Sequence, residues 1–328
     1  MPETVTSLHW RSLTAEDVPA WAELLAAVEL VDQTGENESA EDLAEQIEDE
    51  SVDLATDSWG VFDEGRLIAV GAVHGATQVW DVDTVYCFGT VHPSYRGRGV
   101  GRRLLHEQLQ RAEAMHAQRH PQHPARITVP WYDHIPSAVA LVKAAGLQPL
   151  RHFFDMERDL RSDAPTPRDP AAPLRVVPFT FDRDEEVRRA HNTAFRDHFG
   201  STERDPASWK QWFTGKRAFR SELSYLVLDG DAAVAGYLLA YFYDADAAAA
   251  GYRTAYIGQL GTLPQSRSKG VASALLSHAL ADYRAAGYEQ AGLDVDSANG
   301  TGALGLYERI GFRTVHSSTS WVREVSAG

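Results

Sequence analysis

The sequence is organised around one loop, Thr262-Leu263-Pro264-Gln265-Ser266-Arg267-Ser268-Lys269-Gly270-Val271-Ala272. An apolar run at 255–260 before it predicts a strand, and apolar residues at 272, 275, 276, 279, 280 and 283 follow one face of a helix. The first turn of such a helix presents backbone N–H groups without helical partners, and the helix dipole adds positive potential there. Because Gly270 has no side chain, a ligand can approach the backbone closely. The loop therefore predicts a pyrophosphate site.

The glycine pattern separates this loop from two better-known phosphate loops. It lacks the Gly-Lys-Ser/Thr of a P-loop and the Gly-x-Gly-x-x-Gly of a dinucleotide-binding fold. The pattern that fits is Arg-x-x-Gly-x-Ala, from Arg267 to Ala272. A second copy runs from Arg96 to Gly101, and again an amphipathic segment follows, with leucines at 104, 105 and 109. So short a motif carries weight here because it occurs twice in matching surroundings.

Composition places the chain among ordinary globular proteins. Of its 328 residues, 44% are hydrophobic and 23% are charged, and the length suits two domains. The formal net charge of −15 argues against a nucleic-acid partner, which requires a basic surface, and is compatible with steering of a cationic acceptor. We expect no signal peptide, no membrane partner and a cytoplasmic location.

Disulfide and metal chemistry find little support in the sequence. The chain has one cysteine, Cys87, which excludes an internal disulfide and is expected to be a buried, inert thiol. His116, His120 and His123 are interrupted by Pro121 and have no carboxylate or thiol at ligand spacing. We therefore expect these histidines to lie in a solvated loop, and we expect no metal site.

The predicted elements occur in the same order in both halves of the chain. The first half reads as a strand at 10–13, helices from 14 and at 39–50, a hairpin at 59–73, a strand at 85–91, the loop and its helix to 118, a strand at 127–129, a helix at 137–145 and a strand at 152–156. The second half reads as a strand at 175–179, helices at 184–195 and 209–213, a hairpin at 225–239, a strand at 255–260, the loop and its helix, a strand at 291–295, a helix at 303–310 and a strand at 318–323. Four prolines between 161 and 173 predict a linker. We therefore predict a duplicated unit, with domains at 1–160 and 174–328 joined by a linker at 161–173.

With these repeats the chain resembles the GCN5-related N-acetyltransferases, the GNAT superfamily, over nearly its whole length outside the linker. The resemblance rests on the two loops and on Leu306-Tyr307-Glu308-Arg309-Ile310-Gly311-Phe312, which matches a motif of the family. It implies an α/β (α+β) fold with two domains, each a mixed, mostly antiparallel twisted sheet with a splayed parallel strand pair and flanking helices. It also implies that acetyl-CoA, the co-substrate, lies between the splayed strands at 255–262 and 291–295.

The resemblance also implies which residues contact the cofactor. A backbone N–H near Thr262 would hold the thioester carbonyl, where a fixed donor stabilises developing negative charge. Asn299 matches the family position that contacts the pantetheine arm; the alternative is a turn residue beside Gly300. The implied cofactor residues are Leu260, Thr262, Leu263, Arg267, Ser268, Lys269, Gly270, Val271, Ala272, Ser273 and Asn299 in the second half, and Val91, Arg96, Gly97, Arg98, Gly99, Val100, Gly101 and Arg102 in the first.

Two catalytic roles follow from the same resemblance. Tyr307 takes the position of the residue that protonates or hydrogen-bonds the departing thiolate. An ordinary phenol, with a pKa of about 10, stays protonated at neutral pH and can therefore serve as this acid. The alternative for Tyr307 is a side chain that only packs. The acceptor amine must lose a proton, and the candidate bases are Asp294 and Asp296, of which Asp296 is our choice. The alternative for either aspartate is to cap the next turn.

Acceptor pockets in this family are built by the first two helices of a domain. In the second half these helices carry Phe195, His198 and Trp209, which we predict to bind the substrate together with Gln259. Aromatic residues at helical spacing fit a packed core equally well. We expect transfer of an acetyl group to the primary amine of a small molecule by direct attack, without an acyl-enzyme, in a monomer or homodimer.

Three alternatives remain open for the function. The layout is similar to that of the mycothiol synthases, tandem members of the superfamily with a glutamate on the strand before the C-terminal loop; here 255–260 contains no carboxylate. A non-catalytic acyl-CoA sensor or scaffold would not require Tyr307. An aminoacyl-tRNA-dependent transferase fits poorly with the acidic net charge.

The two halves differ at the catalytic position. When they are aligned on Gly146 and Gly311, Val142 falls opposite Tyr307 and His134 falls opposite Asn299. Valine can neither donate a proton nor form a hydrogen bond to a thiolate. We therefore predict that only the C-terminal domain does chemistry, while the N-terminal domain, which keeps its CoA loop, supports the C-terminal one or binds CoA without turnover.

Overall fold

The structure, a computed structural model, describes residues 8–48, 53–196, 198–298 and 302–328. It divides into two compact units, which we call unit 1 (Met1–His152 with Ser318–Gly328) and unit 2 (Phe153–Ser317). Each unit is built on a mixed, mostly antiparallel sheet with flanking helices, which confirms the expected fold class.

Unit 1 has its strands in the order β1-β2-β3-β4-β5-β12. These strands are β1 (His9–Arg11), β2 (Ser58–Asp63), β3 (Arg66–Gly75), β4 (Asp83–Val91), β5 (Ala125–Tyr132) and, from Ser318 on, β12 (Arg313–Val325). The helices are α1 (Val18–Asp32), α2 (Ala40–Ile47), α3 (Leu54–Asp57), α4 (Val100–Arg119) and α5 (Pro136–Ala144), with short 3₁₀ turns η1 (Ala15–Asp17) and η2 (Pro93–Tyr95).

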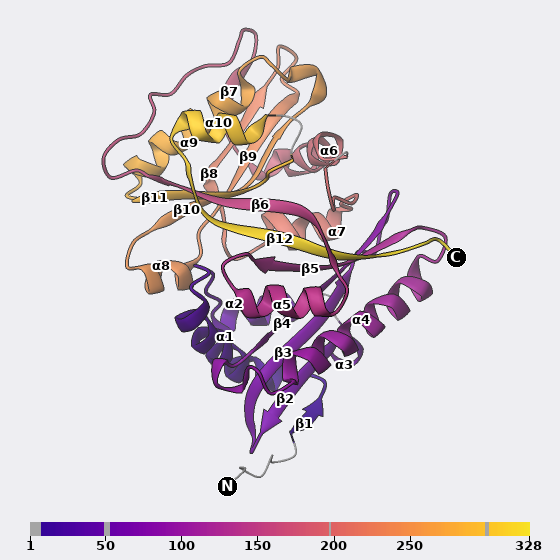
Figure 1. The fold of residues 1–328 in the computed structure, drawn as a ribbon. Helices are drawn as coiled ribbons and strands as arrows, with labels where there is room; N and C mark the ends of the chain where they lie inside the picture. The colour runs from indigo at the N-terminus through magenta and orange to yellow at the C-terminus, as the bar shows by residue number, and fades with distance from the viewer. Residues whose placement is uncertain (1–7, 49–52, 197, 299–301) are drawn as a thin grey trace. The chain divides into compact units, whose positions relative to one another are not determined.

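Local signals in the sequence explain several of these elements. The first helix begins at the predicted capping box, in which Thr14 and Asp17 satisfy each other's backbone N–H groups. Glu64 and Gly65 both have positive φ, 48° and 86°, which is the turn that matches the twist of a two-residue hairpin. Helix α4 packs along β3 and β4 (Figure 1), and its buried Leu105 and Leu109 form the core there with residues of both strands.

Unit 2 repeats the arrangement with its strands in the order β6-β11-β10-β9-β8-β7. These strands are β6 (Gln148–Asp159, from Phe153 on), β7 (Arg175–Pro178), β8 (Phe219–Leu228), β9 (Val234–Tyr241), β10 (Thr254–Thr262) and β11 (Gln290–Asp296). The helices are α6 (Asp184–Ala194), α7 (Pro206–Trp209), α8 (Asp244–Ala250), α9 (Val271–Ala285) and α10 (Ala303–Ile310), with turns η3 (Phe181–Arg183), η4 (Lys210–Thr214, π-helical) and η5 (Pro264–Ser266).

The two faces of the unit 2 sheet pack against different helices. On the face that we call the α9 face, Ala255, Ile257 and Leu293 join a buried cluster with side chains of α9 and α10. On the opposite face, which we call the α6 face, Tyr237 and Tyr241 join a second cluster with α6, α7 and η4. Residues that alternate along β10 and β11 therefore point to one or other of these two environments.

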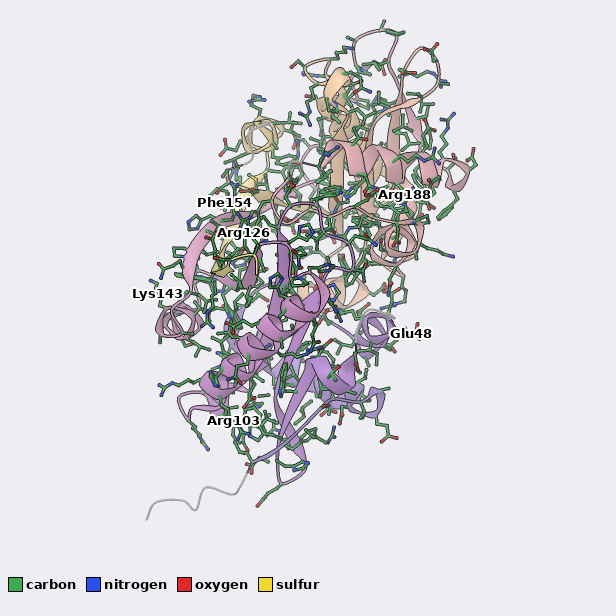
Figure 2. The ribbon with its side chains drawn as sticks, turned by 90° about the vertical axis from the view of Figure 1, so that its right-hand side faces the viewer. Glu48, Arg103, Arg126, Lys143, Phe154 and Arg188 are labelled. Carbon is green, nitrogen blue, oxygen red and sulfur yellow. The ribbon has the colours of Figure 1, made fainter. Side chains whose placement is uncertain are left out.

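The last strand of each half of the sequence lies in the sheet that is built mainly by the other half. From Phe153 to Asp159, β6 pairs with β11, and from Ser318 to Val325, β12 pairs with β5. The division into units thus differs from the predicted domains at 1–160 and 174–328 by an exchange of these strands. An arginine on each exchanged strand bonds a carbonyl at the end of a helix: Arg158 bonds Ile310 O and Arg323 bonds Ala145 O. In unit 1 the ammonium of Lys143 (Figure 2) also lies over the ring of Trp321, at 5.4 Å from its centroid.

The proline-rich segment at 161–173 is packed onto unit 2. Its Ala171 N–H donates to Lys269 O at 3.0 Å, its Arg168 N–H donates to Ser277 Oγ at 3.0 Å, and Pro170 is buried. The predicted linker therefore follows α9 (Figure 1) as an ordered strap.

Candidate active site

The two glycine loops have the same backbone design. Gly270 (φ 79°) and Gly99 (φ 86°) are the N-caps of α9 and α4, in a left-handed conformation that favours glycine. The first helical bonds run from Ala274 N to Gly270 O, 2.9 Å, and from Arg103 N to Gly99 O, 3.1 Å. The N–H groups of the three residues before each donor thus lack helical partners, which is the geometry that suits a pyrophosphate.

The loops differ in how their side chains are held. In unit 1 the Arg96 guanidinium forms two bonds to the Asp32 carboxylate, at 2.6 and 2.7 Å, and a third to Val91 O. Its counterpart Arg267 is exposed. Gly97 has φ of 74°, whereas its counterpart Ser268 has φ of 62°, a conformation that costs a residue with a side chain free energy. The second loop therefore holds strain that the first avoids.

Both units contain the splayed pair of parallel strands that the resemblance implied. In unit 2, β10 pairs with β11 only from Thr254–Gln290 to Tyr256–Gly292, although both strands run further. In unit 1, β4 pairs with β5 from Asp83–Ala125 to Tyr86–Thr128 and the strands then part. Each unit therefore has an opening between strands ahead of its glycine loop.

A β-bulge distinguishes unit 2. The register between β10 and β9 shifts between Ile257 and Gln259, so Gly258 is an extra residue, whereas β4 pairs with β3 in continuous register. A bulge leaves backbone groups outside the ladder and is common beside active sites. A Cβ on Gly258 would meet the Tyr241 ring at 2.5 Å, so only glycine fits. The sequence signal for this bulge is a glycine within a strand, and Gly258 was not among the predicted site residues.

Tyr307 of α10 is close enough to Asp294 of β11 for the carboxylate charge to act on its phenol. Tyr307 is buried, with its ring 6.0 Å from that of Phe312, centroid to centroid. Burial, and then the charge of Asp294, raise the pKa of the Tyr307 phenol, so the group stays protonated at neutral pH. Its packing and its predicted role as an acid are therefore compatible.

Asp294 belongs to a polar pair on the α6 face. Its carboxylate is exposed and accepts a hydrogen bond from Tyr256 OH at 2.8 Å. Burial and the Asp294 charge raise the pKa of Tyr256, so the tyrosine acts as a donor that orients the carboxylate. Asp296, in contrast, is buried, and its Oδ1 accepts the Ala298 N–H at 2.9 Å, as expected of a turn cap. Asn299 lies outside the described residues.

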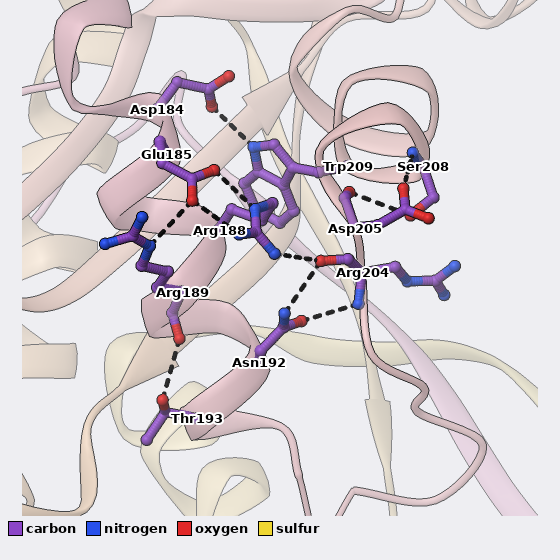
Figure 3. Close-up of polar contacts among 10 residues, drawn as sticks. All are labelled: Asp184, Glu185, Arg188, Arg189, Asn192, Thr193, Arg204, Asp205, Ser208 and Trp209. Atoms are coloured by element: carbon purple, nitrogen blue, oxygen red, sulfur yellow. Dashed lines mark hydrogen bonds and ion pairs between the residues drawn. The ribbon is translucent and has the colours of Figure 1, made fainter. Parts of the chain in front are cut away.

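The predicted acceptor residues lie on the α6 face or under it. Trp209 is 2% exposed, stacks on Phe213 at 4.5 Å, and donates its indole N–H to Asp184 at 2.7 Å. The structure thus places Trp209 in the core. Figure 3 shows how Arg188 and Asn192 of α6 bind Arg204 O, which holds the following loop against the helix.

His191, Phe195 and His198 form a row of neighbouring rings at the end of α6, in which the first pair is stacked and the second is tilted. Phe195 lies 4.6 Å from the His191 ring and 5.1 Å from the His198 ring, centroid to centroid. His191 is bonded to Tyr237 OH at 2.8 Å, and burial lowers its pKa to about 3. Phe195 and His198 are half-buried, and Gln259, by alternation with Leu260, points to the same face.

The histidines and the cysteine of the first half have structural surroundings. His116 lies in α4, contrary to the expected loop, and is buried against Asp83 at 2.8 Å. Burial raises the pKa of the Cys87 thiol to about 12, which leaves it unreactive. In the described part of the chain, no group of three or more His, Cys, Asp or Glu side chains is arranged to bind a metal, and no helix could span a membrane.

Comparison with known families agrees with the duplicated architecture. The model of the acetyltransferase (GNAT) family matches the chain twice, at residues 21–132 and 185–312. The chain belongs to the GNAT family of acetyltransferases. It is therefore an acyltransferase of the tandem type, from a family whose co-substrate is acetyl-CoA.

Individual relatives extend this result. A mycothiol acetyltransferase from Thermobispora bispora is 31% identical and aligns over 72% of each chain; one from Frankia casuarinae is 27% identical over 98% of this chain and 97% of its own. The GCN5-related N-acetyltransferase from Sphaerobacter thermophilus has a TM-score of 0.75 at 25% identity, over 98% of this chain and 96% of its own. A tandem GNAT protein from the clavulanic acid biosynthesis pathway shares the fold, with a TM-score of 0.71 at 17% identity over 98% of this chain and 99% of its own.

Proposed function

We propose that unit 2 transfers the acetyl group of acetyl-CoA to a primary amine of a small molecule. The observation that carries this proposal is the bulge at Gly258, two residues beyond Tyr256, whose hydroxyl binds Asp294. Unit 1 has a glycine loop and a splay, but it has continuous β3–β4 register and Val142 in place of the tyrosine. The difference supports chemistry in unit 2 alone.

The proposed step is a direct displacement at the thioester. The amine nitrogen bonds to the acetyl carbon, and the carbon–sulfur bond breaks. Asp294, oriented by Tyr256, takes the proton that the amine loses, directly or through water, and the Tyr307 phenol gives a proton to the leaving thiolate. Backbone N–H groups freed at the bulge and strand end stabilise the charge that develops on the carbonyl oxygen.

Asp294 replaces Asp296 as the base in this proposal. The Asp296 carboxylate is buried and caps the Ala298 N–H, whereas the Asp294 carboxylate is exposed and pairs with a hydroxyl that orients it. A base must reach the substrate, so accessibility favours Asp294.

The cysteinyl-sugar precursor of mycothiol is a specific acceptor candidate. It is favoured by the names of the relatives, which are mycothiol acetyltransferases. The absence of a carboxylate from residues 255–260 argues against it, but Asp294 on the adjacent strand could take the proton instead.

The test is thiol release from acetyl-CoA against a panel of amines, amino acids, polyamines, aminoglycosides and the mycothiol precursor. Gly270→Glu and Gly99→Glu are a matched pair, because both positions are left-handed N-caps of long helices. We expect Gly270→Glu to abolish turnover and Gly99→Glu to keep it while removing one CoA from the stoichiometry measured by calorimetry. The opposite result would place the chemistry in unit 1, and CoA binding without turnover on any amine would favour a sensor.

A further inference from the structure

A cavity of about 990 Å³ lies beside the second glycine loop, within unit 2. Its walls come from the end of β6, the linker strap, the start of α9, the end of α10 and the residues that follow α10. The residues that matter here are Arg158, Arg168, Ser273, Ser277, Arg309 and Arg313. Ser273 belongs to the first turn of α9, so the cavity opens next to the N–H groups that we assign to the pyrophosphate.

The cavity contains positive charge that the protein does not neutralise. Arg158 pairs with Asp163 at 3.3 Å, and Asp159 of the wall pairs with Arg161 at 3.0 Å. Within the described ranges no ion-pair partner is recorded for the side chains of Arg168, Arg309 or Arg313, and all three residues are exposed. In a chain with a net charge of −15, three such guanidinium groups around one cavity indicate an anionic ligand.

The remaining carboxylate of the wall, Glu157, does not offset these groups. It accepts a hydrogen bond from the Gln290 side chain, and burial raises its pKa, which favours the neutral form. The cavity is therefore suited to a phosphate, whose oxygens accept bonds from several guanidinium groups at once.

The first half of the chain has no counterpart of this cavity lining. In the alignment on Gly146 and Gly311, Ala144 falls opposite Arg309 and Gln148 falls opposite Arg313. Since the glycine loops themselves match, these arginines are what set the second site apart.

The strap is fixed in place independently of any ligand. Besides the bonds of Ala171 and Arg168 to α9 and its loop, Asp169 lies 3.5 Å from His278 Nε2, and Pro170 lies within 3.8 Å of the point where a Cβ on Gly270 would sit. The backbone of Arg168 is thus held beside the second glycine loop, so only its side chain has to lose conformational freedom when a ligand binds.

We infer that the strap, the end of α10 and the start of β12 bind the phosphorylated nucleoside end of CoA, with Arg168, Arg309 and Arg313 around its ribose 3′-phosphate. This inference rests on the proposed use of acetyl-CoA by unit 2. In CoA the 3′-phosphate is on the ribose next to the pyrophosphate, so a pyrophosphate on the first turn of α9 puts the ribose at the cavity. The segment that joins the two halves is then a cofactor-specificity element of one of them.

The test compares acetyl-CoA with acetyl-3′-dephospho-CoA in steady-state kinetics on the full chain. We expect the KM of the dephospho compound to be about 10- to 100-fold higher at similar kcat, as for loss of charge-assisted hydrogen bonds. The triple variant Arg168→Ala, Arg309→Ala, Arg313→Ala should raise the KM of acetyl-CoA to the dephospho level and leave the KM of the dephospho compound unchanged. Arg168→Ala alone should give part of this effect, and Arg175→Ala, an exposed arginine outside the cavity, should give none.

Equal KM values for the two compounds in the intact protein would overturn the inference. If no acceptor is found, calorimetry with CoA, 3′-dephospho-CoA and adenosine 3′,5′-bisphosphate separates the two proposals, because preference for the 3′-phosphate must still appear and must be lost in the triple variant. Binding of inorganic phosphate or the bisphosphate at the arginines without discrimination between the two CoA forms would mean a separate anion site, and would also refute it.

Discussion

Replacing Tyr307 with phenylalanine removes one oxygen and tests the proposed acid. The ring stays packed against Phe312, and within the described residues no hydrogen-bond partner is recorded for the hydroxyl, so the free energy of unfolding should change by about 1 kcal/mol or less. Loss of a positioned acid typically slows a reaction by about 10²–10⁴, or about 3–5 kcal/mol in activation free energy. We therefore expect a large loss of kcat with unchanged stability and unchanged CoA affinity.

The assay is thiol release at saturating acetyl-CoA, with CoA affinity from calorimetry and stability from urea unfolding. The matched control is Val142→Ala at the corresponding position of unit 1, where the valine is fully buried. Removing two buried carbons should cost about 2 kcal/mol of stability and leave kcat within about two-fold. Near-normal kcat in Tyr307→Phe, or a loss of kcat matched by a loss of folded protein, would refute the assignment.

Three further predictions concern the role of Asp294 as a base, the backbone strain at Ser268 and the pH dependence of stability. Asp294→Asn should lower kcat/KM by about 10²–10⁴, with a deficit that narrows at alkaline pH as the free amine becomes abundant; a deficit independent of pH would count against a proton-transfer role. Ser268→Gly should raise the free energy of unfolding, measured in urea, by about 0.5–1 kcal/mol, and Gly97→Ser should lower it by a similar amount. Changes of the same sign in the two variants would contradict the strain argument. The pKa of His191 is lowered to about 3 in the folded protein, so between pH 6.5 and 3 only the unfolded chain takes up a proton at this residue. The free energy of unfolding should therefore fall by up to about 1.4 kcal/mol per pH unit as the pH is lowered through this range. His191→Phe should lose this contribution to the pH dependence of stability.

Features encoded within short stretches were predictable from the sequence. The capping box at Thr14, the hairpin at Glu64-Gly65 and the two glycine loops each depend on residues that are neighbours in the chain. Their duplication then gave the order of elements and the family. Helix α8 is an alanine-rich run in the second half that was not predicted from the sequence, because the first half has no matching predicted segment with which to compare it.

Features that depend on pairing between distant strands were not predictable in the same way. Asp294 and Asp296 are two residues apart on one strand and look equivalent in the sequence, and only the bond from Tyr256 of the neighbouring strand and the cap at Ala298 distinguish them. The strap is a similar case. Its prolines indicate a segment without a ladder, but its packing on α9 depends on Ser277 and Lys269, about a hundred residues away.

The exchanged strands set an order of completion during synthesis. Unit 2 is a continuous segment and can close its sheet once residue 317 has been made, whereas unit 1 needs residues 318–325 to pair with β5. The half that is translated first is therefore finished last, against the usual order in which an N-terminal domain folds before the rest of the chain. Until then β5 has an open edge, the kind of surface on which chains associate wrongly. A chain that ends just before residue 318 would lack the strand that completes unit 1, yet it would keep every residue of unit 2.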